Sequence, residues 1–460
     1  MENRMNELQS REVKIAYIGG GSRDWAHCLI KDLALCPRLR GCLALYDIDQ
    51  RAARANVKVA DAIFGHRDAV TKFRTTATRT AREALVGADF VVMSIEPGPI
   101  TMRYADLEIP EQYGIVQSVG DSTGPGGVLR ALRSIPVYQD YARQIMAHCP
   151  RAWVINYTNP MTLCTAALYA ACPEIRAFGC CHEVFGTQAM LAKRVARWFH
   201  VPQPPREFIA LDISGVNHFT FATSASWEGH DLFDRLRREI RRPGFFRDRT
   251  AEARLHKRKG QVFSSDYMVA FDFFARFGVL GAAGDRHLAE FVPWYLQNEK
   301  VLHRWGVVLT PYSYRLQRAR SRRAAFVLPE KLAISDEEGV NQMLALLGLA
   351  SLDTNVNLPN RGQNPDLPLG AVTESYAQFR RDCVTPLLAR PLPNILSSHV
   401  RRIAGNQQTI LQAAMAHDKE LAFQALLNDP LVHLSTDQAW EMFNQMLRYA
   451  KSMLPGWKIR

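Results

Sequence analysis

The stretch Val13-Lys-Ile-Ala-Tyr-Ile-Gly-Gly-Gly-Ser22 begins with six residues typical of a β-strand and continues into three glycines and a serine. A helix-like segment then extends to about Cys36. Glycines between a strand and a helix let the backbone approach a pyrophosphate, whose charge is favoured at the N-terminus of the helix. The GxGxxG pattern is incomplete, because Asp24 and Trp25 occupy its later positions. Alone, this turn is equally consistent with a purely structural role.

Further β-type runs follow along the first half of the chain, separated by helical patterns. Each run ends in polar or glycine residues, and the runs are Leu43–Tyr46, Phe90–Ile95, Ala152–Asn156 and Arg176–Cys180. Strands that alternate with helices predict a doubly wound parallel sheet, so we expect a Rossmann-like α/β domain over residues 11–200. Ligands of such sheets bind beyond the carboxyl ends of the strands, and the residues that follow the strands are therefore the candidates for chemistry.

Asp47 follows the second predicted strand directly and lies 26 residues after Gly21. A carboxylate at this place can accept hydrogen bonds from the ribose hydroxyls of NAD and would repel the extra phosphate of NADP. Glu96, near the end of the third strand, is a further candidate for the same site. With Asp47, the turn predicts a dinucleotide site whose other residues are Gly19, Gly20, Gly21 and Ser22.

The pattern changes after about residue 200. A strand at Leu211–Ser214 leads to Gly215-Val216-Asn217-His218, and helical patterns then dominate, including 399–428 and 436–453. Residues 353–374 are rich in Asn, Pro and Gly, which predicts a long loop. Because 460 residues exceed one ordinary core, we expect residues 201–460 to form a second, α+β domain that binds substrate and metal.

The motif Cys180-Cys181-His182-Glu183 follows the fifth predicted strand, and His218 follows the later one. A buried thiol pair beside a helix start would explain the first motif without any function, and a lone histidine is usually a satisfied polar residue. If both strand ends share one crevice, a thiolate and an imidazole there would bind a divalent ion with open coordination positions. The residues alone leave both interpretations open.

Composition excludes several classes of protein. Hydrophobic residues make up 47% and charged residues 22%, which is typical of a globular protein, and no run approaches the roughly 20 apolar residues of a membrane span. Met1–Glu12 lacks the apolar core of a secretory signal. The nine cysteines are odd in number and sparse, which argues for reduced thiols. We therefore expect a cytoplasmic protein with no membrane partner.

The formal net charge is +12, and much of the excess lies in Arg235–Lys259 and Arg315–Arg323. Solvated helix faces and loops account for most such runs. Nucleic-acid binding would require interleaved stacking aromatics or a known module, and neither is visible, so no nucleic-acid partner is expected. A small anionic substrate attracted by a positive field is the better functional interpretation.

Taken together, the motifs resemble glycoside hydrolase family four over nearly the whole chain. The residues that match, in order, are Val13–Ser22, Arg103–Gln117, Thr123–Gly127, Asn156–Pro160, Cys181-His182, Gly215–His218, Asn357–Asn360 and Ala422–Pro430. The shared order and spacing make the resemblance specific. It implies a fold similar to lactate and malate dehydrogenases, a bound NAD and usually Mn²⁺. We also expect a homo-oligomer, either a dimer or a tetramer.

The resemblance implies redox-assisted elimination rather than the usual two-carboxylate chemistry of glycosidases. A hydride leaves C3 of the sugar, a base removes the C2 proton, the aglycone leaves C1, water adds, and the hydride returns. By position, Cys181 and His218 resemble the metal ligands, and Arg103 and Asn159 resemble substrate contacts. His182 lies where some members carry the acid that protonates the leaving group.

Tyr267 resembles the base that removes the C2 proton, and Asp285 is the competing candidate. Arg286, with His287 beside it, resembles a substrate-binding arginine and would suit a substrate carboxylate. The segment Cys181-His182-Glu183-Val184 resembles the subgroup that acts on α-galacturonides, with Glu183 as a further substrate contact. The resemblance thus implies release of α-linked galacturonic acid from small oligosaccharides. The alternatives are an α-glucuronidase or α-galactosidase of the same family, an NAD-dependent hydroxyacid dehydrogenase and a non-catalytic NAD-binding sensor.

Overall fold

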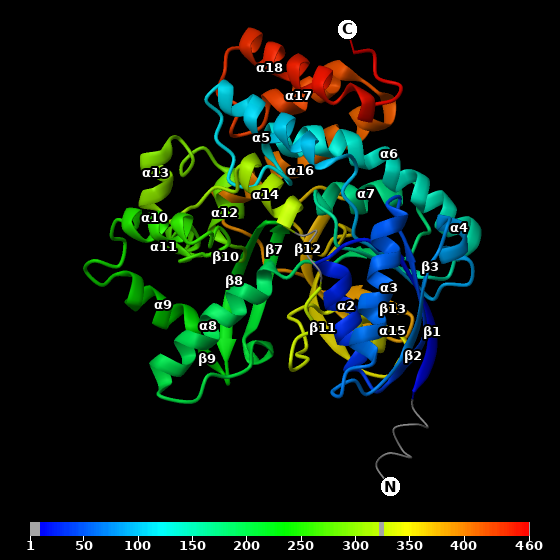
Figure 1. The fold of residues 1–460 in the computed structure, drawn as a ribbon. Coiled ribbons are helices and arrows are strands. Elements are labelled where there is room, and N and C mark those ends of the chain that lie inside the picture. Colours follow the sequence, from blue (N-terminus) through cyan, green and yellow to red (C-terminus); the bar gives the residue numbers. More distant parts are fainter. Residues whose placement is uncertain (1–9, 322–325, 460) are drawn as a thin grey trace.

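One mixed sheet of thirteen strands runs through residues 10–321 and 326–459, the part of the chain that the computed structural model describes (Figure 1). The strand order is β10-β8-β7-β12-β11-β6-β5-β4-β1-β2-β3, with β9 paired to β8 and β13 paired to β12. Residues 1–9, which include most of the predicted non-secretory start, lie outside the described residues, as do Arg322 and Arg323 of the second basic run.

The six strands of the first part are all parallel and have the order β3-β2-β1-β4-β5-β6. Their bounds are β1 Arg11–Ile18, β2 Leu39–Tyr46, β3 Phe73–Ala77, β4 Phe90–Met93, β5 Trp153–Asn156 and β6 Ala177–Gly179. This is the strand order of a dinucleotide-binding Rossmann domain. The predicted doubly wound sheet is therefore confirmed, and only β3 had not been anticipated among these strands.

Helices cover both faces of the parallel strands. Alternate residues of a strand therefore bury their side chains in the core on one face or in the core on the other. Ala16 and Ile18 of β1 belong to one buried cluster, and Ile15 and Tyr17 belong to another. The helices of this part are α2 Trp25–Ala34, α3 Gln50–Phe64, α4 Ala81–Leu85, α5 Arg103–Gln112, α6 Gly124–His148, α7 Met161–Ala171 and α8 Glu183–Phe199. Burial on both faces explains why β4 is uniformly apolar rather than alternating.

Beyond β6 the sheet continues with antiparallel strands. These strands are β7 Ala210–Val216, β8 Phe219–Trp227, β9 His230–Asp231, β10 Leu280–Gly281, β11 Leu352–Pro359, β12 Val372–Arg380 and β13 Cys383–Pro386. The prediction that 353–374 is a long loop is wrong at both ends, where β11 and the start of β12 lie. Asn355 and Asn357 resemble loop residues by type, but in β11 their Nδ2 atoms donate to Oε1 of the buried Glu374 at 3.0 and 3.1 Å.

The remaining helices surround the antiparallel strands and cap the molecule. They are α9 Leu232–Ile240, α10 Thr250–Arg258, α11 Met268–Phe277, α12 Asp285–Leu288, α13 Glu299–Arg304, α14 Tyr312–Ser321, α15 Gly339–Leu346, α16 Asn394–Ala416, α17 Lys419–Leu427 and α18 Thr436–Tyr449. Short 3₁₀ segments lie at Ile100–Met102, Arg206–Phe208, Ala289–Phe291 and Lys451–Met453. The helix predicted over 399–428 is two helices, because His417 has a φ of 52° and ends α16.

The two halves of the chain are interwoven. Strands β11–β13 extend the sheet of the first half, and α16–α18, at the top of Figure 1, share a buried core with α5, α6 and α7. The division into domains at residue 200 falls between α8 and the 3₁₀ segment Arg206–Phe208, and it remains a prediction. Within the described residues, no helix has both the length and the apolar character that a membrane crossing requires.

Candidate active site

A cavity of about 500 Å³ is lined by residues from both halves of the chain. Its walls come from the segments that follow β5 and β6, from the β7–β8 turn, and from the starts of α11 and α12. This volume suits a small-molecule ligand. Of the residues predicted from the sequence, the cavity is lined by Asn159, Cys181, His182, Glu183, His218, Tyr267, Asp285, Arg286 and His287. The predicted substrate and metal residues, apart from Arg103, are thus brought together.

Cys181 lies between the end of β6 and the first residue of α8, and its side chain is buried. Burial, together with the negative charges of Glu374 and Glu183, raises the pKa of this thiol well above its usual value. The N-terminus of a helix and a bound cation both favour a thiolate. A metal beside Cys181 would therefore be required for the thiol to lose its proton and act as a ligand.

His218 occupies the tight turn between β7 and β8, where its φ is 70°. Burial and the charge of His287 lower the pKa of His218 to about 3, so the imidazole is neutral at pH 7. Its Nδ1 lies 2.9 Å from Oγ of Ser122, which leaves Nε2 for another ligand. A neutral, oriented imidazole is the form that binds metals.

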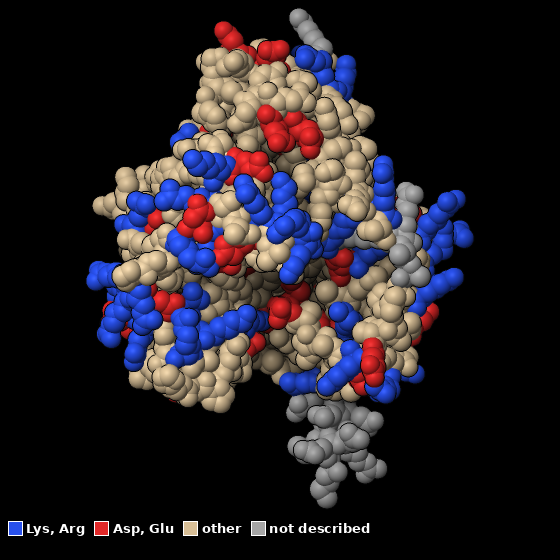
Figure 2. All heavy atoms as spheres, turned by 60° about the vertical axis from the view of Figure 1, so that its left-hand side comes forward, with Lys and Arg blue, Asp and Glu red and all other residues tan. Residues whose placement is uncertain are grey.

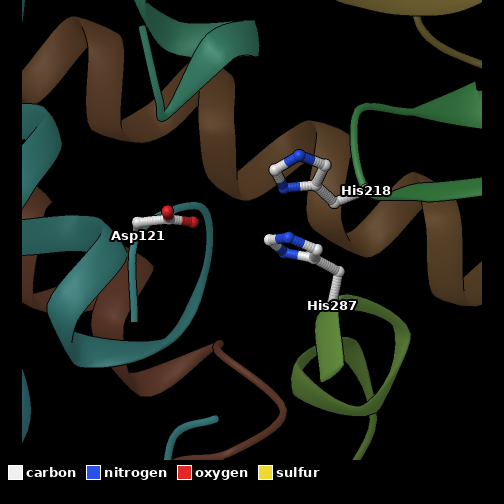
Figure 3. Close-up of side chains that lie close together, drawn as sticks. All are labelled: Asp121, His218 and His287. Atoms are coloured by element: carbon white, nitrogen blue, oxygen red, sulfur yellow. The ribbon is translucent and has the colours of Figure 1, made fainter. Parts of the chain in front are cut away.

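Two further side chains join His218 in a group that could hold a metal ion, and they point toward one another in Figure 3. The ligand atoms of Asp121, His218 and His287 all lie within 4.8 Å of one another. Nδ1 of His287 is buried and has no hydrogen-bond partner. A carboxylate and two imidazoles, with a thiol lining the same cavity, fit a divalent transition metal. Cys181 lines the cavity outside this close group.

The sequence did not single out Asp121, because an aspartate in a glycine-rich loop is common. The structure shows that hydrogen bonds to a buried glutamate hold the loop of Asp121 in place. Oε1 of the buried Glu290 accepts hydrogen bonds from the amides of Val119 and Gly120 at 2.7 and 2.8 Å. Burial raises the pKa of Asp121, but His287, His218, Arg103 and Arg315 more than offset that effect and lower it to about 2.

His182 lies at the cavity entrance, with 43% of its side chain exposed. Its Nδ1 is 3.1 Å from Oε1 of Glu337, an acid that the sequence gave no reason to select. Burial alone would lower the pKa of His182, but Glu337 and Glu183 raise it to about 9. The ring of Trp25 contacts the imidazole of His182 and also stacks on the ring of Tyr157, with the two ring centroids 5.4 Å apart. The imidazole is therefore positively charged and can donate a proton into the cavity.

Glu183 is held in place by backbone and histidine rather than projecting freely. Its Oε2 accepts the amide of Gly284 at 2.6 Å, and its Oε1 lies 3.6 Å from Nε2 of His287. Burial raises the pKa of Glu183, but His287, His182 and His218 more than offset this and lower it to about 2. Its negative charge is thus partly neutralised by its neighbours.

Tyr267 and Asp285, the two candidate bases, differ in what their oxygens do. The Tyr267 hydroxyl lines the cavity and donates to the carbonyl of Gly186 at 3.0 Å. Burial raises its pKa to about 12. The carboxylate of Asp285 accepts three backbone amides at the start of α11, those of Met268, Val269 and Ala270, at 2.8–3.1 Å. Burial raises its pKa to about 7, against the opposite effect of these amides.

Two of the predicted contacts with substrate and cofactor, the buried Arg103 and the exposed Glu96, belong to one ion-pair network. Nε of Arg103 lies 2.6 Å from Oε1 of Glu96, and Asp106 lies 3.8 Å from its Nη1. Arg130 also pairs with Glu96, at 3.2 Å. Arg103 does not line the cavity, whereas Asn159 does, with its Nδ2 at 3.5 Å from Oδ2 of Asp121. The roles predicted for Arg103 and Glu96 remain predictions.

The glycine turn after β1 is packed tightly against the neighbouring strand ends. Gly19 has a φ of 92°, and a Cβ there would lie 2.0 Å from the carbonyl oxygen of Ser94. The amide of Gly21 donates to Oδ2 of Asp47 at 2.9 Å, which joins the turn to the end of β2. A turn without side chains at the carboxyl end of the central strand, beside an acid on β2, fits a dinucleotide.

Comparison with known families matches most of the chain. Residues 14–197 match the model of the family 4 glycosyl hydrolases, and residues 213–432 match the model of their C-terminal domain. An α-galacturonidase of Thermoanaerobacterium saccharolyticum is 44% identical, covering 99% of this chain and 100% of its own length. An α-galacturonidase of Bacillus subtilis is 43% identical, covering 95% of this chain and 97% of its own.

Solved structures agree with this assignment. A Bacillus subtilis protein described as a glucosidase has a TM-score of 0.84 and 41% identity, covering 95% of this chain and all of its own. A 6-phospho-α-glucosidase from gut microorganisms, solved with NAD and Mn²⁺, shares the fold at 19% identity, with a TM-score of 0.77 and coverage of 97% and 100%. A lactate dehydrogenase from a deep-sea metagenome shares it more distantly, with a TM-score of 0.52, 12% identity and coverage of 88% and 99%. The chain belongs to the family 4 glycosyl hydrolases.

Proposed function

We propose that this protein hydrolyses α-linked galacturonic acid from small oligosaccharides, with bound NAD and a divalent metal. The observation that carries the substrate class is Arg286. It lines the cavity, is 7% exposed, and has no carboxylate oxygen within 4.0 Å among the described residues. A buried guanidinium without a counter-ion suits the carboxylate of a uronic acid, which a neutral hydroxymethyl group cannot replace. The relatives at 44% and 43% identity bear the same activity in their names.

The two cofactors have separate places in this proposal. Gly19–Ser22 and Asp47 would hold the dinucleotide, and His218, Cys181, Asp121 and His287 would hold the metal. Bound NAD supplies reversible acceptance of a hydride, and a bound divalent cation stabilises negative charge beside the reacting carbons. These ligands combine a soft thiolate, two imidazoles and a hard carboxylate. This combination favours a transition metal such as Mn²⁺ over Mg²⁺.

Tyr267 is the base that removes the C2 proton in this proposal. Its hydroxyl faces the cavity, whereas both carboxylate oxygens of Asp285 are occupied by the amides of α11. Tyr267 immediately precedes α11, with a φ of 59°. Asp285 therefore acts as the anchor of the helix that positions Tyr267, and a cation held in the cavity would lower the pKa of the phenol toward the working range.

His182 is the acid that protonates the departing aglycone. Glu337, 3.1 Å from its Nδ1, orients the ring and stabilises its charged form. The exposed position of His182 at the entrance suits a group that meets the aglycone rather than the bound sugar. Asn159 and Glu183, which follow the neighbouring parallel strands β5 and β6, line the cavity and are proposed to contact sugar hydroxyls.

The decisive experiment is an assay with nitrophenyl α-galacturonide, α-glucuronide and α-galactoside, with NAD⁺ and Mn²⁺ added or omitted. We expect cleavage of the galacturonide only when both are present, and no net formation of NADH. Stoichiometric NADH would instead identify a dehydrogenase. NAD binding without cleavage of any glycoside would identify a sensor, and faster cleavage of the galactoside would reject the carboxylate site.

A cytoplasmic location suits reduced cysteines, all nine of which are free in the described residues. Lys and Arg side chains border a hollow on the face shown in Figure 2, with Asp or Glu side chains inside it, which suits attraction of small anions rather than nucleic acid. A homo-oligomer, a dimer or tetramer, is proposed, and light scattering after gel filtration measures its mass.

A further inference from the structure

A second arginine lines the cavity beside Arg286, and neither the sequence motifs nor the family resemblance singled it out. Arg315 is the fourth residue of α14, which begins at Tyr312. Both arginines bind the same residue: Nη2 of Arg286 donates to Oγ1 of Thr310 at 2.5 Å, and Nε of Arg315 donates to its carbonyl at 3.4 Å. Thr310 therefore fixes both guanidiniums on one wall of the cavity.

The wall is itself tied to the loop that carries Asp121. Oγ1 of Thr310 donates to the carbonyl of Ser118 at 2.9 Å, and Nη2 of Arg315 donates to the carbonyl of Val119 at 2.7 Å. Oγ of Ser118 in turn donates to the carbonyl of Arg286 at 2.5 Å. Each arginine is thus held by neutral oxygens, which orient its charge without neutralising it.

The two charges lack counter-ions inside the protein. Among residues 10–321 and 326–459, no carboxylate oxygen lies within 4.0 Å of either guanidinium, whereas Arg206, which lines the same cavity, pairs with Glu338 at 2.7 Å. Desolvation is the main cause that lowers the pKa of Arg315 to about 10, and the charges of Arg103 and Arg286 act in the same direction against those of Asp121 and Glu96. A buried and a half-buried cation without a directly paired carboxylate are costly in the free protein, and a bound anion relieves that cost.

We propose that Arg315 and Arg286 together bind the carboxylate of the galacturonic acid unit that is cleaved, so that Arg315 determines specificity for uronic acids. This inference rests on the proposed function. One carboxylate has two oxygens and about four lone-pair positions, which is enough for two guanidiniums. The binding energy gained from both arginines is unavailable to a neutral galactoside of the same shape.

A purely structural role for Arg315 makes a different prediction. Because Arg315 also holds the carbonyl of Val119, its removal could displace Asp121 and thereby weaken every substrate equally. A second possibility is that Arg315 meets the carboxylate of the neighbouring uronic acid in an oligosaccharide. The ratio between charged and neutral substrates, and between one and two uronic acid units, separates these roles.

The test uses the full-length enzyme with NAD⁺ and Mn²⁺ and the variants Arg315→Gln and Arg315→Lys. Arg320→Gln is the matched control, because Arg320 is an exposed cation on the same helix. We measure kcat/KM for nitrophenyl α-galacturonide, nitrophenyl α-galactoside and digalacturonate, and the affinity for free galacturonate and galactose by calorimetry. For Arg315→Gln we expect a loss of about ten- to hundredfold on the galacturonide, mainly in KM, against less than about threefold on the galactoside.

We expect Arg315→Lys to recover part of the loss and Arg320→Gln to match the wild type. An equal loss on galacturonide and galactoside would show that Arg315 only supports the Asp121 loop, and would overturn the proposal. A loss confined to digalacturonate would overturn it too, by moving Arg315 to the neighbouring unit. If the wild type itself shows no preference for the galacturonide, the proposed function fails instead. Where galactoside turnover is too slow, the calorimetric ratio of galacturonate to galactose gives the same decision.

Discussion

Two groups of arginines in this molecule have opposite surroundings. Beneath the glycine-rich loop, Arg133 makes a bidentate pair with Asp106 at 2.8 and 2.9 Å, and Arg103 lies 2.6 Å from Glu96. On the cavity wall, Arg286 and Arg315 are held by hydroxyl and carbonyl oxygens alone among the described residues. Arg315 is half-buried and the other three are buried, so the two groups differ mainly in ion pairing, which distinguishes cations that stabilise the fold from cations kept for a ligand.

The same distinction applies to the whole site. The ligand atoms of Asp121, His218 and His287 converge where a metal ion could bind, whereas the buried Asp106 already pairs with Arg103 and Arg133. Groups that await a ligand are destabilising or neutral in the free protein, and groups that complete each other are stabilising. Substitutions in the cavity should therefore cost activity, and substitutions in the network should cost stability.

The largest expected effect is at the metal ligands. Cys181→Ser and His218→Ala should each lower kcat/KM by more than about 1,000-fold and weaken Mn²⁺ binding, because each removes a ligand that the cation needs. The free energy of unfolding should stay within about 1 kcal/mol of wild type, measured by urea denaturation without metal. Cys383→Ser, which changes an exposed thiol, is the control and should leave both quantities unchanged. A fully active Cys181→Ser enzyme after chelation would exclude Cys181 as a ligand.

The candidate bases should separate in the same way. Tyr267→Phe should lower kcat by about 100- to 1,000-fold while NAD binding, metal binding and stability persist, because only the proton acceptor is lost. Asp285→Asn should instead lower the free energy of unfolding by about 1–3 kcal/mol, since three amides of α11 lose a charged acceptor. Exchange of the C2 proton with deuterated solvent measures the base directly. Exchange that survives in Tyr267→Phe and is lost in a stable Asp285→Asn would reverse the assignment.

The central comparison is tested by Arg286→Gln against Arg103→Gln. For Arg286→Gln we expect about ten- to hundredfold lower kcat/KM on the galacturonide and unchanged or higher stability, because a buried unpaired charge is removed. For Arg103→Gln we expect a loss of about 3 kcal/mol in the free energy of unfolding, because Glu96 and Asp106 lose a partner. Thermal melts and kinetics on the same preparations measure both. Two variants that lose activity alike and stability alike would show that pairing does not separate the two groups.

The sequence predicted those parts of the fold that local pattern determines. The runs that became β1, β2, β4, β5 and β6 are mainly apolar and end in polar or glycine residues, so their place in a parallel sheet followed from the sequence. The strand β11 was not predicted from the sequence, because its residues Asn355 and Asn357 are typical of loops. Their compatibility with a strand depends on Glu374, which lies on another strand and becomes their neighbour only after folding.

The candidate site divides in the same manner. Cys181 and His218 were found through motifs and Tyr267 through the family resemblance, and the structure brings them to one cavity. Asp121 and Arg315 were missed, because their significance comes from long-range contacts. Asp121 meets a histidine from the β7–β8 turn and another from α12, and Arg315 shares Thr310 with Arg286. The immediate sequence neighbours of a charged residue do not show whether it has an ion-pair partner elsewhere in the chain.

The smallest expected effect concerns Asp47, which lies at the junction between a structural and a ligand-binding role. Its Oδ2 accepts the amide of Gly21 at 2.9 Å, and its Oδ1 accepts the amide of Asp49 at 2.8 Å. An asparagine retains one acceptor for the turn but loses the negative charge that would bind ribose hydroxyls and repel a 2′-phosphate. Asp47→Asn should therefore weaken NAD binding by about five- to tenfold, roughly the contribution of one ordinary hydrogen bond, and improve NADP binding.

Calorimetric titration with both dinucleotides measures the change in preference at Asp47. Asp49→Asn is the matched control, because that carboxylate accepts the amides of Arg51 and Ala52 at the start of α3 and should affect stability alone. Helix capping of this kind is worth about 1 kcal/mol, which a denaturation curve resolves. If NADP stays excluded to the wild-type degree in Asp47→Asn, the acid only ties the glycine turn to β2. Asp47 would then resemble Asp106, whose carboxylate is paired within the protein, and the selection of NAD would have to come from another residue.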